Sequence, residues 1–149
     1  NMAVHKIDGG PGGENDHFPK KFVTLYGTAA ITAGNWVMFD VSDTTNGLGG
    51  SVVTATNTAN GEQLVLGVAA TTTTAAGNVV VQIAGKYVDA AVDVTMAAGS
   101  SIVVSDAGTG AAGRGQIYVA GDLAPICGIA LEDDTAGVAD VMIINQGYF

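Results

Sequence analysis

The chain has 149 residues, of which 22 are glycine and 13% are charged, and its formal net charge at pH 7 is -9. This length fits one domain, or two small halves that share a core, and so low a charged fraction is unlike a disordered chain. Five basic residues against 14 acidic ones exclude a nucleic-acid-binding role, because phosphate contacts need Lys and Arg. We also expect no membrane segment and no signal peptide, because no apolar run of about 18 residues and no basic-plus-apolar leader occurs.

Residues 1–19 differ in composition from the rest and predict an extended N-terminal arm. Residues 9–13 are four glycines around a proline, which leave the backbone free and give it little to bury. Such an arm becomes ordered when a neighbouring subunit or a partner holds it, so we expect it to act as a latch. Residues 20–149 then form a β-rich body.

Both histidines, His5 and His17, lie in this arm with acidic residues between them. They could be read as a metal site or a catalytic pair, but a Gly-rich segment fixes no geometry between them. Contact with a partner or plain solvation is the favoured interpretation. We therefore expect no metal, no cofactor and no enzymatic activity.

From residue 20 onward, short runs rich in Val, Ile and Thr are separated by turn residues, a pattern typical of strands. The expected strands are Lys20–Tyr26, Trp36–Val41, Ser51–Thr56, Gln63–Ala70, Asn78–Ala84, Tyr87–Val92, Ser101–Ser105, Gln116–Ala120, Pro125–Leu131 and Ala139–Ile144. No window has a clear apolar period of 3.6 residues, and the best helix candidate, Val88–Ala98, fits a short strand or a single turn equally well. The sequence predicts an all-β fold, a small barrel or sandwich.

Three short motifs occur twice in the same order, which indicates a duplicated β unit. The pairs are Ala33-Gly34 with Ala98-Gly99, Leu66-Gly67-Val68-Ala69 with Cys127-Gly128-Ile129-Ala130, and Ala76-Gly77 with Ala136-Gly137. Each unit runs out at a tyrosine, Tyr87 or Tyr148. We expect two similar units, residues 31–87 and 96–148, forming two sheets or two halves of one barrel.

Two features could suggest chemistry, and each has a simpler explanation. Residues 108–113 match G-x-G-x-x-G, but a dinucleotide loop needs a helix after the glycines, and residues 114–119 read as a turn and a strand. A hairpin loop is the favoured interpretation.

Cys127 is the only cysteine and lies in an apolar run, so we expect a buried thiol rather than a nucleophile.

Residues 132–134, Glu-Asp-Asp, are the densest acidic run. Such carboxylates could contribute oxygen ligands to Ca²⁺, but the spacing is not that of an EF-hand loop. A solvated loop is favoured here, and also for Asp40 and Asp43.

A basic and aromatic cluster joins the arm to the body of this acidic chain. Lys20 and Lys21 lie beside Phe18 and Phe22, and a local reversal of charge is where contact with a partner is expected. The full set of expected contact residues comes from the arm and this cluster: His5, Lys6, Ile7, Phe18, Lys20, Lys21 and Phe22.

The repeated order of motifs across Ile31–Asn145 resembles that of tailed-bacteriophage capsid decoration proteins, also called cement proteins. The resemblance implies a small β-barrel or sandwich subunit, a homotrimer in the virion that sits on the outer capsid surface. Such a subunit bridges copies of the major capsid protein, stabilises the head and has no catalytic residues. The alternatives are a carbohydrate- or receptor-binding β module of a viral fibre or spike, an enzyme-accessory or Ca²⁺-dependent module centred on residues 132–134, and a shell-forming capsid protein.

Overall fold

The computed structural model describes residues 19–40, 42–45, 50–54, 65–104, 112–121 and 125–144, and these form strands and turns without a helix. The strands are β1 (Lys21–Gly27), β2 (Trp36–Phe39), β3 (Ser51–Thr54), β4 (Val65–Ala69), β5 (Gly77–Ala91), β6 (Ser101–Val103), β7 (Gln116–Ile117), β8 (Gly128–Ala130) and β9 (Val138–Ile143). The all-β prediction is confirmed. No described segment is a helix of the length and hydropathy that a bilayer crossing requires.

The first five strands close into a small barrel. They follow the order β1-β3-β2-β4-β5, and β1 also pairs with β5, so the sheet returns on itself. The closing pair is antiparallel and runs from Lys21 opposite Ala84 to Gly27 opposite Gly77. Because closure pairs both edges of every strand, this barrel leaves no long open edge.

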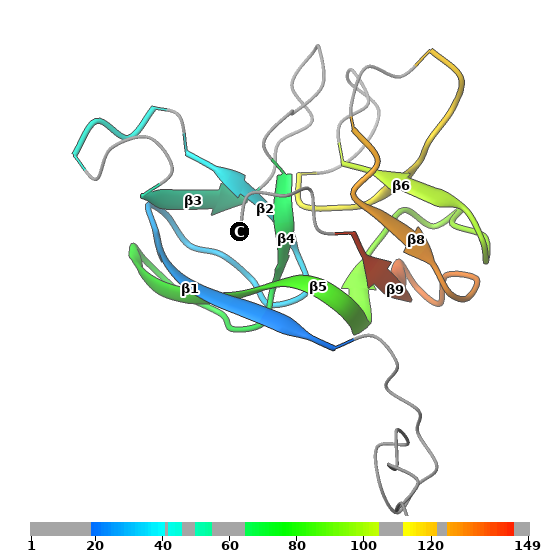
Figure 1. Cartoon of the computed structure of the whole chain (residues 1–149), viewed down its shortest axis with the longest axis horizontal. Coiled ribbons are helices and arrows are strands. Elements are labelled where there is room, and N and C mark those ends of the chain that lie inside the picture. Colours follow the sequence, from blue (N-terminus) through cyan, green and yellow to red (C-terminus); the bar gives the residue numbers. More distant parts are fainter. Residues whose placement is uncertain are drawn as a thin grey trace, which may run out of the picture.

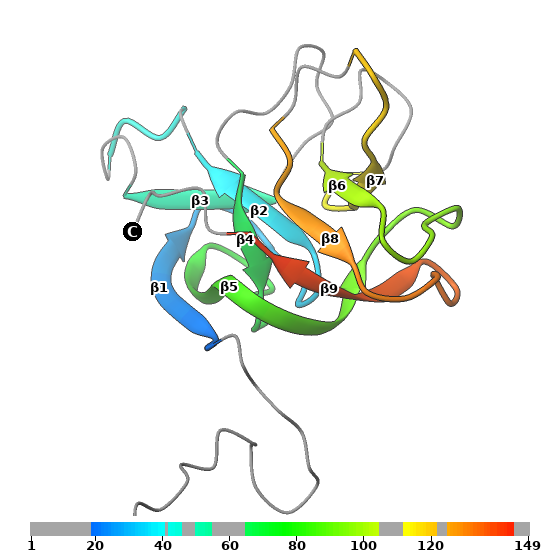
Figure 2. The same ribbon diagram turned by 45° about the vertical axis from the view of Figure 1, so that its right-hand side comes forward.

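The second half of the molecule shares β5 with the first. The sheet continues from β5 through β9, β8 and β6 to β7, and a parallel bridge between Val92 and Gly115 brings the residues flanking β7 back to the end of β5. Figure 1 and Figure 2 show β5 as a long curved strand that links the β1–β4 half to the β6–β9 half. The fold is therefore two closely similar β units with one strand in common.

The hydrogen-bond register repeats between the two units, which bears out the duplication expected from the sequence. Gly34 N–H donates to the Ala69 carbonyl at 2.8 Å, and Gly99 N–H donates to the Ala130 carbonyl at 2.8 Å. Both glycines have positive φ, +91° and +82°, a conformation that side chains rarely adopt. The equivalent strand pairs are Val37–Gly67 and Ile102–Gly128, Val68–Gln82 and Ile129–Met142, and Ala69–Val81 and Ala130–Val141.

Alternating side chains divide β2 between two hydrophobic cores. Val37 and Phe39 point into the first barrel, with Ile31, Val52, Leu66, Ala69, Val79, Val81 and Ile83. Trp36 and Met38 point the other way and pack with second-unit residues that include Val92, Ile102, Val141 and Ile143. Trp36 and Phe39 therefore lie on opposite sides of their strand. The outer face of β2 and β4 is thus the interface between the units.

Some strand bounds differ from the expected ones. Asn78–Ala84 and Tyr87–Val92 are parts of one strand, β5, because Gly85 takes φ +90° and the Gln82 side chain donates to the carbonyls of Ala84 and Lys86. These contacts carry the backbone through a bend where the sequence suggests a break. β7 and β8 are shorter than expected, and β2 ends at Phe39. Of the expected arm, residues 1–19, only Pro19 is among the described residues. Tyr148 lies outside them.

Candidate interaction surfaces

The first candidate surface, here called the β1 strip, consists of the exposed residues Lys20, directly before β1, and Lys21, Phe22, Thr24 and Tyr26 of β1. Period-two alternation places Val23 and Leu25 against the first core and leaves Phe22 and Tyr26 49% and 39% exposed. Residues 20–27 contain two lysines and no acid. The strip is therefore an aromatic and basic surface on an acidic protein.

The second candidate surface is the outward side of the second unit, here called the β8–β9 face and consisting of Ile129, Leu131, Met142 and Ile144. Ile129 lies directly opposite Met142 in the register, and Leu131 N–H donates to the Asp140 carbonyl on β9 at 2.8 Å. Ile129, Leu131 and Ile144 are each about 40% exposed: 38%, 43% and 38%. Large aliphatic side chains adjacent on one sheet face mark a surface suited to contact with another molecule.

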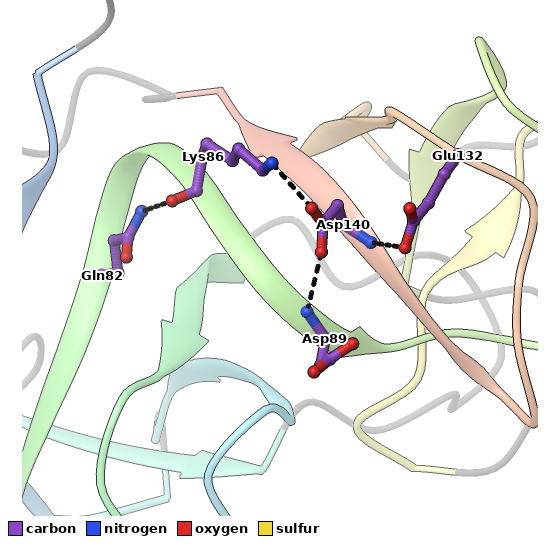
Figure 3. A network of polar contacts seen from close by, with 5 residues as sticks. All are labelled: Gln82, Lys86, Asp89, Glu132 and Asp140. Carbon is purple, nitrogen blue, oxygen red and sulfur yellow. Dashed lines mark hydrogen bonds and ion pairs between the residues drawn. The ribbon is translucent and has the colours of Figure 1, made fainter. Parts of the chain in front are cut away.

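An acidic network borders the β8–β9 face (Figure 3). The Lys86 ammonium lies 2.7 Å from Asp140 Oδ2, and Asp89 N–H donates to Asp140 Oδ1 at 3.2 Å. Asp140 N–H in turn donates to Glu132 Oε1 at 3.1 Å. Residues 128–144 contain four acids and no base, so this border is negative apart from Lys86.

The carboxylates of this network also form a group of the kind that can hold a cation. Oxygen atoms of Asp89, Glu132 and Asp140 lie within 4.8 Å of one another, but Asp89 and Glu132 are exposed and Lys86 already balances Asp140. The group is adequately explained as a surface ion-pair and hydrogen-bond network. Sequence spacing could not reveal it, because its members come from β5, β9 and the loop between β8 and β9.

The acidic run at residues 132–134 does not converge on one point. Asp133 accepts from Ala98 N–H at 2.9 Å, Asp134 accepts from Gly137 N–H at 3.3 Å, and Glu132 joins the network around Asp140. Each carboxylate satisfies a different backbone donor. This arrangement favours the expected loop over a Ca²⁺ site made by these three residues, although the loop is hydrogen-bonded to the body rather than only solvated.

Comparisons with known proteins assign no family to this chain. No protein-family model matches it, and no curated protein matches it. The exposed surfaces of the described residues are therefore the features that bear on function.

The structure describes part of the contact set expected from the sequence. Lys20, Lys21 and Phe22 lie at the start of β1 and are exposed, as a contact role requires. His5, Lys6, Ile7 and Phe18 lie outside the described residues. The β8–β9 face was missed, because its residues read in the sequence as ordinary strand interior.

The internal repeat holds the signal that would have identified this face. The position equivalent to Ile129 is Val68, which is 0% exposed and belongs to the core between the two units. The position equivalent to Met142 is Gln82, which is 3% exposed. The same strand face is therefore covered in the first unit and uncovered in the second.

Two features singled out in the sequence have structural explanations. Cys127 is buried, its thiol lies 3.4 Å from the Ile102 carbonyl, and burial raises the pKa of this thiol far above its usual value, so the thiolate nucleophile is disfavoured. The glycine run leads through Gly113 and Gly115 into strand β7. Within the described residues 112–121, no helix of the kind that a dinucleotide loop requires follows the glycines.

Asp40 stabilises a turn on the first barrel. Its carboxylate accepts from the Ser42 hydroxyl at 2.6 Å, from Ser42 N–H at 2.9 Å and from the Thr28 hydroxyl at 2.6 Å. These hydrogen bonds, that of the Ser42 side chain most of all, lower the pKa of Asp40 below its usual value. Asp40 is thus a turn-stabilising residue as well as a solvated one.

Proposed function

We propose that this chain is a capsid decoration, or cement, protein that binds the outer surface of the major capsid protein and stabilises the head as a homotrimer. The observation that carries the proposal is the pair of uncovered surfaces, the β1 strip and the β8–β9 face, which lie on different units of a duplicated β body. Two such surfaces would let each copy contact both of its neighbours in the homotrimer, while the arm, residues 1–19, would reach the capsid. A location on the outer capsid surface in the virion follows from this role.

The charge distribution supports the same function. A net charge of -9 suits a protein that faces solvent on the outside of a shell and does not contact packaged nucleic acid. The two lysines of the β1 strip come directly after the expected arm, residues 1–19. The arm and the residues that follow it would then contact the capsid or a neighbouring copy, with Ile7, Phe18 and Phe22 as apolar anchors and His5, Lys6, Lys20 and Lys21 as polar contacts.

The proposal is tested by sedimentation with capsids that lack the protein. We expect the full chain to pellet with such particles and to raise the temperature at which they open. Deletion of residues 1–19 should leave the β body folded, as judged by circular dichroism, but reduce occupancy on the particles. A full chain that stays in the supernatant at every concentration would refute the proposal, whereas a truncated chain that decorates fully would refute the latch role of the arm alone.

One observation favours a second candidate, a carbohydrate- or receptor-binding module of a viral fibre or spike. Phe22 and Tyr26 are exposed on the same side of β1, and exposed aromatic rings are surfaces on which sugars can stack. This candidate predicts binding on a glycan array that is lost in Phe22→Ala and Tyr26→Ala. The decoration role predicts no glycan binding by the full chain.

A further inference from the structure

The two candidate surfaces complement one another in charge and in apolar character. The β1 strip presents Phe22 and Tyr26 with two lysines and no acid, while the β8–β9 face presents aliphatic side chains beside Glu132 and Asp140. Opposite charges at the rim of an apolar contact fix its register and disfavour other pairings. Because both surfaces belong to the same chain, the β1 strip of one copy is complementary to the β8–β9 face of another copy.

The repeat shows that this sheet face can be covered by a β unit. In the first unit, the equivalent face is already an interface, since Val68 is buried in the core shared with the second unit. In the second unit the described residues leave the equivalent position, Ile129, 38% exposed. A second copy of the chain would place its own first unit on that face, so that first and second units alternate from one copy to the next.

We propose that copies of this chain associate head to tail, with the β1 strip of one copy on the β8–β9 face of the next. This inference rests on the proposed function only in its choice of a closed ring, the homotrimer, over an open filament. Contacts between two different surfaces either close into a ring or continue indefinitely. The net charge of -9 opposes self-association elsewhere on the surface, so the opposite charge character of these two surfaces selects this contact.

The test uses two single-face variants of the full chain, Phe22→Glu in the β1 strip and Leu131→Glu in the β8–β9 face. Both residues are exposed, 49% and 43%, so neither change places a charge inside a folded monomer. Val94→Glu is the matched control, because Val94 is 72% exposed and belongs to neither surface. Masses are measured by analytical ultracentrifugation over a range of concentrations.

We expect the wild-type chain and Val94→Glu to self-associate, and each single-face variant to remain monomeric at the same concentrations. A mixture of the two variants should form a complex of one copy of each, because each retains the surface that the other has lost. A wild-type chain that remains monomeric, variants that associate like the wild type, or a mixture that stays monomeric would each overturn the inference. Circular dichroism melting identifies a variant that fails to fold, in which case Phe22→Ser or Leu131→Ser replaces it.

The outcomes separate this inference from the proposed function. A chain that associates head to tail but does not bind capsids would refute the decoration role and leave the interface standing. A monomer that decorates capsids would refute the interface and leave the decoration role standing.

Discussion

The indole of Trp36 lies directly against Gly128, so that the first unit is in close contact with the second at this point. A Cβ built on Gly128 would lie 2.9 Å from Trp36 Cη2 and 2.9 Å from the Met142 carbonyl oxygen. Trp36 is 0% exposed, and its Nε1 donates to the Ala91 carbonyl at 3.2 Å. The glycine is therefore required by the approach of a side chain from the other unit.

Gly128→Ala should destabilise the protein by about 1–3 kcal/mol, the typical cost of overpacking a core. The strand must shift, or Trp36 must move within a core that has no room for it. Gly77→Ala is the control, because a Cβ there would meet its nearest atom at 4.0 Å. Urea denaturation followed by tryptophan fluorescence measures both. Equal stability for the two variants would contradict the close contact.

Arg114→Met should lower the free energy of unfolding by roughly 1.5–3 kcal/mol, the usual contribution of hydrogen bonds from a charged group. Arg114 Nη1 donates to the carbonyls of Val92 and Gly137, at 2.7 Å and 3.0 Å, and so ties together backbone segments that close the second unit. Burial raises the pKa of Asp93 and the Arg114 charge partly offsets this, so the pKa of Asp93 should rise further in the variant. NMR titration of the carboxyl carbons measures that change.

The control for Arg114 is Lys86→Met, which removes the ion pair with Asp140. Lys86 is 47% exposed, and an exposed pair of this kind contributes at most about 1 kcal/mol. A larger loss of stability in the Lys86 variant than in the Arg114 variant would contradict this ranking.

Asp40→Asn should lower stability near neutral pH and have no such effect in acid. The pKa of Asp40 is lowered in the folded state, by hydrogen bonds from Ser42 and Thr28, so its contribution is present above the unfolded value of about 4 and is lost as the pH falls through the folded value. Because the group is close to solvent, we expect a difference below about 1 kcal/mol. Urea denaturation across pH 2 to 7 measures it. A difference in unfolding free energy between the wild type and Asp40→Asn that does not change with pH would contradict this role of the Asp40 carboxylate.

Cys127 should not react with a disulfide reagent in the folded protein. Its side chain is 2% exposed and burial raises its pKa, so both access and thiolate are lacking. We expect labelling at alkaline pH to follow unfolding and to be immediate in denaturant. Fast labelling of the native chain would place the thiol outside the core.

Most strands were predictable because β-branched residues and turn residues mark them locally. The duplication was also readable, since Ala-Gly turns and the glycines opposite Val37 and Ile102 recur for backbone reasons that hold in both units. The bend in β5 was not readable. It depends on Gln82 reaching the carbonyls of Ala84 and Lys86, a tertiary arrangement that looks like two strands in the sequence.

The candidate surfaces were predictable only in part. The β1 strip follows from local composition, because Lys20, Lys21 and Phe22 are consecutive. The β8–β9 face does not, because Val68 and Ile129 have the same hydrophobic character in the sequence, and only the packing of one unit on the other buries the first and exposes the second. Whether a strand residue faces a core or a partner is decided by how the units stack.

The most direct test of the decoration role is sedimentation of the purified full chain with capsids that lack it, with occupancy measured against concentration. We expect saturable binding to the outside of the particle, together with increased resistance of the particle to heat. A folded chain that leaves both the pellet and the heat resistance of the capsids unchanged would contradict it.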